Sequence, residues 1–106
     1  MKLPKITLLI SLLFVSISPY SKADIAPPEA GKRIIVHKVG KGEELHLLAG
    51  YYLLNAREWG KIYVWNSDVI SNQNRIYPGQ ELIVYVDENW QPPYDLNAYL
   101  RSIGRK

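Results

Sequence analysis

The sequence contains no cysteine among its 106 residues. This absence excludes disulfide bonds, thiolate metal sites, a cysteine nucleophile and a lipid anchor on cysteine. Small exported domains commonly depend on disulfides, so a fold of this size without them must be stabilised by its core alone. The chain has one Met and one Phe, but three Trp and eight Tyr. These large side chains can supply such a core.

Acidic residues are absent from the first 23 positions, which contain three of the thirteen Lys and Arg. From Asp24 onward ten acidic residues balance ten basic ones, so the formal net charge of +3 belongs to the leader. The alkaline character therefore does not indicate nucleic-acid binding, and we expect no nucleic-acid partner. The length allows one small domain.

Residues Met1–Ala23 have the pattern of a signal peptide. Two lysines precede an apolar run from Ile6 to Ile17, and the segment ends in a Ser-Lys-Ala sequence that suits signal peptidase. As a helix the apolar run would span about 18 Å, which is too short for the roughly 30 Å of a bilayer core. We therefore expect cleavage before Asp24, an exported soluble protein and no stable membrane anchor afterwards.

The rest of the sequence predicts an α+β domain in the order strand, helix, helix, strand. A Pro-containing linker at residues 24–32 leads into a β-branched strand at Arg33–Val39, and a second strand covers Leu82–Val86. Between them, apolar side chains at helical spacing predict one helix over Leu45–Tyr52 and another over Glu58–Trp65. This order favours a two-stranded antiparallel sheet with both helices on one face.

The domain, predicted over residues 33–86, is followed by a tail at residues 87–106 with a short helix of its own. Asp95 can cap this helix. Its apolar positions, at i, i+3, i+4 and i+7, are Leu96, Tyr99, Leu100 and Ile103. Alternation along the strands directs four apolar side chains away from the two main helices: Ile34, Val36, Ile83 and Tyr85. An uncovered apolar face is unusual, so we expect the tail helix to dock there, with a partner protein or second copy as the alternative.

Three groups of residues between Ile35 and Val86 follow one known pattern. The first group runs from His37 to Leu45 and continues to Leu48-Ala49. The second consists of Trp59, Ile62, Tyr63 and Asn66, and the third of Ile70, Asn72, Asn74, Ile76, Tyr77-Pro78-Gly79-Gln80, Leu82 and Val84. In order and spacing these groups resemble the lysin motif (LysM) family, from its opening strand through both helices to its closing strand.

The resemblance implies the βααβ LysM fold and non-catalytic binding of glycans that contain β-1,4-linked N-acetylglucosamine, with no cofactor. Peptidoglycan or a related glycan, such as a chitin-type oligomer, is the expected partner, with peptidoglycan favoured. The protein is expected in the periplasm or otherwise exported, in association with the cell wall. The family's groove lies between the loop after the first strand and the loop before the second. Carried over by position, its walls are Gly42, Glu43, Glu44 and Leu45 on one side and Asn74, Arg75, Ile76 and Tyr77 on the other.

Two positions depart from the family pattern. Glu44 stands where the family usually has a hydroxyl residue, and His46 where an aromatic or small residue is frequent. The charge of Glu44 at the lip of the groove could weaken glycan binding or change which glycan fits. Trp59, on the apolar face of its helix, is expected in the core rather than as a platform for sugar.

Single features of the sequence suggest three other functions: a metal site, a glycosidase and an adaptor. His37 and His46 do not make a metal site without a suitably spaced carboxylate or cysteine. The acidic pairs Glu43-Glu44 and Asp87-Glu88 suggest a glycosidase, but adjacent acids diverge, so we expect no catalytic residues. A periplasmic adaptor remains the alternative function: the tail helix and outer sheet face would contact another protein, with glycan binding weak or lost.

Overall fold

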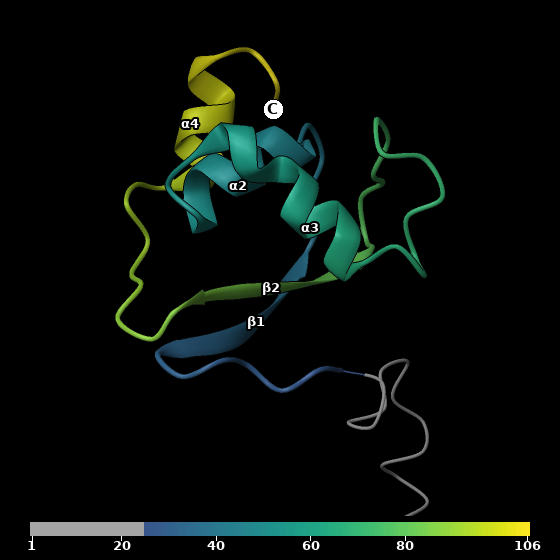
Figure 1. Cartoon of the computed structure of the whole chain (residues 1–106). Coiled ribbons are helices and arrows are strands. Elements are labelled where there is room, and N and C mark those ends of the chain that lie inside the picture. The colour runs from purple at the N-terminus through teal and green to yellow at the C-terminus, as the bar shows by residue number, and fades with distance from the viewer. Residues whose placement is uncertain (1–24) are drawn as a thin grey trace, which may run out of the picture.

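The computed structural model describes residues 25–106, so the predicted leader and its cleavage site lie outside the described residues. Figure 1 shows the strands, the helices above them and a further helix near the C-terminus. In chain order the elements are β1 (Lys32–Lys38), α2 (Leu45–Tyr52), the 3₁₀ turn η2 (Ala56–Glu58), α3 (Trp59–Trp65), β2 (Glu81–Asp87) and α4 (Leu96–Ser102).

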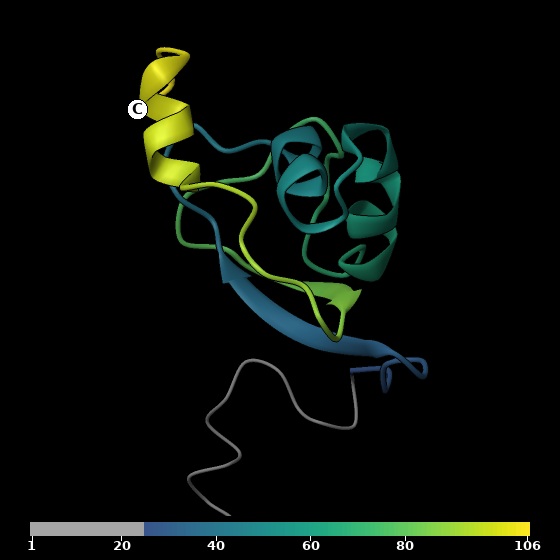
Figure 2. The same cartoon turned by 90° about the vertical axis from the view of Figure 1, so that its left-hand side faces the viewer.

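The two strands form an antiparallel sheet whose register runs from Lys32 opposite Asp87 to Lys38 opposite Glu81. The predicted strand, helix, helix, strand order is therefore confirmed, and Figures 1 and 2 show α2 and α3 on the same side of the sheet. The first helix contains the four apolar positions whose spacing predicts it. The second begins one residue later than predicted, because Glu58 belongs to η2.

The core lies between the sheet and the helices. From α2 it receives the four side chains that helical spacing predicts, namely Leu45, Leu48, Ala49 and Tyr52. The fully buried residues of the facing elements are Ile62, Leu82, Val84 and Val86. Burial of such side chains contributes about 1.5–3 kcal/mol each to the free energy of folding, which is the main stabilisation open to a chain without disulfides.

The buried side chain of Asn66, directly after α3, joins that helix to the sheet. Its amide nitrogen donates to the carbonyl oxygens of Ile62 (2.8 Å) and Ile83 (2.9 Å), and its oxygen accepts from Ile83 N–H (2.7 Å). Both backbone groups of Ile83 therefore point away from β1, and Asn66 takes the place of a third strand at that position. Asn66 is only 1% exposed, so its side-chain oxygen and nitrogen depend on these hydrogen bonds and not on water.

The expected docking of the tail helix on the outer face of the sheet is wrong. Helix α4 lies on the same side of the sheet as α2 and α3 (Figures 1 and 2). Its side chains Leu96 and Leu100 are buried in the same core as those of α2. The physical reason is Trp90, whose Nε1–H donates to the Tyr51 carbonyl (3.0 Å) and whose ring contacts Tyr52. This anchor turns the chain after β2 toward α2 before α4 begins.

The outer face of the sheet is covered in part by the segment before β1. The Tyr85 hydroxyl donates to the Ala26 carbonyl (2.6 Å), and the Trp65 ring packs edge-on against Tyr85. Ile83, expected to point outward, is only 5% exposed, whereas Val36 on β1 is 52% exposed. The segment predicted as a linker thus packs on the sheet and covers part of its apolar outer face.

Replacement of Asn66 by Ala is expected to lower the free energy of unfolding by about 2–4 kcal/mol, because Ile83 N–H and C=O lose their partner while buried. Urea unfolding followed by circular dichroism measures this. The exposed Asn89→Ala variant serves as control and should change stability by less than about 0.5 kcal/mol. Equal stability of the two variants would contradict the role given to Asn66.

Candidate functional site

Two segments far apart in the sequence line one groove of about 600 Å³. Its lining residues are Glu43 and Glu44 from the turn before α2, Leu45 and His46 from the start of α2, Trp59 from α3, and Gln73, Asn74, Arg75 and Ile76 from the loop before β2. Six of the eight residues predicted for the site are among them. Gly42 and Tyr77 are not, and the Tyr77 side chain is 53% exposed.

Sequence reasoning missed three lining residues. Trp59 was assigned to the core, and it is in fact half-buried, with part of its side chain against the core and part in the groove. His46 and Gln73 are exposed neighbours of predicted residues. Their adjacency to Leu45 and Asn74 is the only signal in the sequence that could have indicated them.

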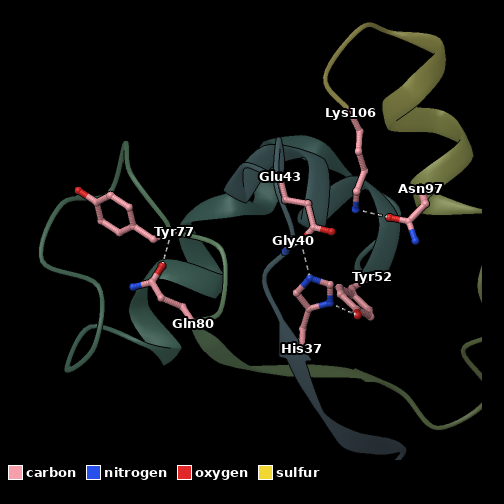
Figure 3. Close-up of polar contacts among 8 residues, drawn as sticks. All are labelled: His37, Gly40, Glu43, Tyr52, Tyr77, Gln80, Asn97 and Lys106. Atoms are coloured by element: carbon pink, nitrogen blue, oxygen red, sulfur yellow. Dashed lines mark hydrogen bonds and ion pairs between the residues drawn. The ribbon is translucent and has the colours of Figure 1, made fainter.

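Backbone turns hold the second wall in place. Asn72 accepts from Asn74 N–H with its side chain (2.9 Å) and from Arg75 N–H with its carbonyl (2.9 Å), so the chain turns tightly and presents both residues. After Ile76, the Tyr77 N–H donates to the Gln80 side chain, as Figure 3 shows, and Gly79 has the positive φ of +94° that this turn requires. Tyr77 through Gln80 therefore form a structural turn at the start of β2.

The first wall is held by a buried polar cluster of His37, Glu43 and Tyr52 (Figure 3). Glu43 Oε1 lies 2.7 Å from His37 Nε2 and accepts from Gly40 N–H at 2.8 Å, while His37 Nδ1 lies 2.6 Å from the Tyr52 hydroxyl. Because an ionised carboxylate only accepts, Nε2 of His37 carries a hydrogen, and in the neutral ring Nδ1 then accepts from Tyr52. Glu43 is thus one of the residues that line the groove, but its carboxylate points into the protein, toward His37 and Gly40.

The ionisation of this cluster follows from its surroundings. Burial alone would raise the pKa of Glu43, but the hydrogen bonds from His37 and Gly40 outweigh it, and the pKa of this carboxyl is lowered. Burial, and next the nearby Tyr51 and Glu43, raise the pKa of Tyr52. The phenol therefore stays protonated at neutral pH and remains able to donate to His37.

The C-terminal residues pack against the first wall of the groove, at Gly42 and Glu44. The sequence does not indicate this packing. The Arg105 guanidinium pairs with the Glu44 carboxylate, which also lies 3.5 Å from His46 Nδ1. A Cβ atom at Gly42 would lie 2.3 Å from the Arg105 carbonyl oxygen, so only glycine fits there. Lys106 Nζ donates to Asn97 Oδ1 on α4 (2.6 Å, Figure 3). The tail thereby braces the turn at Gly42.

Glu44 precedes α2 but gives no cap hydrogen bond to it. A Ser or Thr at this position would be a good cap, whereas Glu44 pairs with Arg105. The first N–H groups of α2 therefore have no side-chain cap, and they lie at the groove.

A second cavity, of about 620 Å³, lies beside β2 and shares no lining residue with the groove. Its lining includes residues 25–27 and the aromatic side chains of Trp65, Tyr85 and Trp90. None of the predicted site residues lines it. Within residues 25–106, no three His, Asp or Glu side chains come together as a metal site.

No protein-family model matches the chain, and no curated protein or solved structure matches it. Among the helices of residues 25–106, none is both long enough and apolar enough to cross a bilayer.

The lowered pKa of Glu43 predicts a specific acid sensitivity. Its folded-state pKa lies below the ordinary value of 4.5, so its contribution to stability is complete above that pH and is lost as pH falls through the lowered value. Glu43→Gln should therefore flatten the loss of stability below pH 4.5. It should also cost about 1–3 kcal/mol at neutral pH.

Urea unfolding midpoints between neutral and acidic pH test this, with the exposed Glu88→Gln variant as control. A Glu43→Gln protein that loses stability below pH 4.5 as steeply as the wild type would refute the assignment.

Proposed function

We propose that this protein binds a glycan containing N-acetylglucosamine, peptidoglycan in particular, without catalysis, in the groove between residues 43–46 and 73–76. The observation that carries the proposal is that residues matched to the two walls of the LysM groove line a single groove here. The strand, helix, helix, strand order is compatible with the LysM fold that the resemblance implies.

The chemistry of the groove suits an acetylated sugar. The side-chain amides of Gln73 and Asn74 can donate to and accept from hydroxyl and acetamide groups, and the uncapped N–H groups at the start of α2 can donate to them. Ile76 and Trp59 are half-buried and give apolar contact to an acetyl methyl group or a sugar face. Leu45 is 5% exposed, so it supports this surface more than it contacts ligand.

Export to the periplasm is part of the proposal and rests on the sequence of Met1–Ala23. An open groove of this size should bind a short glycan weakly, because few groups are removed from water. Retention on the wall would come from the many repeats of the polymer, which raise the effective concentration of sites.

An adaptor that contacts another protein is the second candidate. Three apolar side chains around α4 favour it, since Tyr94 and Tyr99 are each 40% exposed and Ile103 is 44% exposed. Leu96 and Leu100, however, lie in the protein's own core and offer no surface to a partner. The two functions differ in whether the groove residues are needed for retention on the wall.

Sedimentation of the purified protein with insoluble peptidoglycan sacculi tests the proposal. The wild type should pellet with sacculi, and Ile76→Glu should stay in solution, because a charge replaces the apolar contact in the groove. Val64→Glu, at a 66% exposed position outside the groove, is the matched control and should pellet like the wild type. Circular dichroism establishes that each variant is folded.

Ile76 packs partly against the core. If Ile76→Glu unfolds the protein, the exposed Asn74→Ala variant replaces it. A folded wild type that remains in the supernatant would overturn glycan binding and leave the adaptor as the function to pursue.

A further inference from the structure

The charged groups of the groove are not equally available to a ligand. Glu43 is 8% exposed, and its carboxylate is bound by His37 and Gly40. The Glu44 carboxylate is paired with Arg105 and lies near His46. Both acidic residues of the groove therefore already have partners from the protein itself.

Arg75, on the opposite wall, is exposed. Its backbone is fixed by the hydrogen bond to Asn72, whereas its guanidinium takes part in none of the ion pairs found among residues 25–106. Because the Glu43 carboxylate is buried and Arg105 offsets the charge of Glu44, Arg75 carries the exposed charge of the groove lining that has no ion-pair partner among residues 25–106. An exposed guanidinium on a hydrogen-bonded turn is well suited to a carboxylate, to which it can donate two parallel hydrogen bonds.

We infer that the groove prefers a glycan that carries a carboxylate over an uncharged N-acetylglucosamine polymer, with Arg75 binding the carboxylate. This inference rests on the proposed function and narrows its ligand from N-acetylated glycans in general to acidic ones. Arg105 acts as a positioning residue: it touches no ligand, but it holds Glu44 in an ion pair and so limits its repulsion of an acidic ligand.

Wall glycan can supply a carboxylate from two sources. In strands without peptides the lactyl group of every second sugar ends in a free carboxylate. In strands with peptides that group is consumed in an amide, and the carboxylates belong to the peptide. Chitin-type oligomers have neither kind of carboxylate. Comparison of the three glycans therefore distinguishes the contribution of a carboxylate to binding from that of the sugar chain.

The test is titration calorimetry of the full purified protein with soluble glycans of equal length: peptide-free wall strands, peptide-bearing wall strands and chitin-type oligomers. The wild type should bind at least one carboxylate-bearing glycan roughly five- to tenfold more tightly than the chitin-type oligomer, and the difference should shrink at high salt. Which wall strand binds better identifies the source of the carboxylate.

Three variants locate the effect. Arg75→Gln should remove the preference by weakening the binding of the acidic glycan while leaving that of the neutral oligomer unchanged. Arg105→Gln should weaken acidic glycan binding by about two- to fivefold, because Glu44 then lacks its partner. Arg101→Gln, an exposed arginine of α4 outside the groove, is the matched control and should behave as the wild type.

Equal binding of neutral and acidic glycans by the wild type would overturn this inference and leave the proposed function intact. An unchanged preference in Arg75→Gln would overturn the role of that residue. No binding of any of the three glycans by folded protein would overturn the proposed function together with the inference.

Discussion

The carboxamide of Asn66 is the interaction on which the arrangement of the other elements depends. A sheet of two strands is marginal by itself and leaves backbone groups unpaired along both edges. Asn66 binds both backbone groups of Ile83 on one edge and the Ile62 carbonyl at the end of α3. The helix is thereby fixed to the sheet, and the loop that carries Asn74 and Arg75 starts from a defined point.

The opposite wall of the groove depends on contacts made by β1 and by the C-terminal tail. His37 at the end of the strand binds Glu43, and Glu43 binds Gly40, so the turn between β1 and α2 is closed from inside. Arg105 braces the same turn from outside through its contact with Gly42 and its ion pair with Glu44. Since Lys38 is paired with Glu81, both walls begin at the same end of the sheet.

The sequence predicts the elements well because each has a local cause. Three features depend only on neighbours in the chain: the helical spacing in Leu45–Tyr52 and in the tail, the β-branched residues of the strands, and the Asp95 cap. The Asp95 side chain accepts from Ala98 N–H. The position of α4 was predicted wrongly because spacing shows that a helix has an apolar face but not which surface receives it. That choice is made by Trp90 and Tyr51, which are 39 residues apart. The pairing of Arg105 with Glu44 could not be predicted for the same reason.

The central claim is that the groove between residues 43–46 and 73–76 is the binding surface. Nuclear magnetic resonance of isotope-labelled protein titrated with a soluble peptidoglycan fragment tests it most directly. Binding in the groove should change amide shifts with ligand concentration at His46 and from Gln73 to Ile76, while those of the residues around Trp65 and Tyr85 in the second cavity stay unchanged. Shifts confined to the second cavity or to the α4 surface, or no shifts at all in the folded protein, would contradict it.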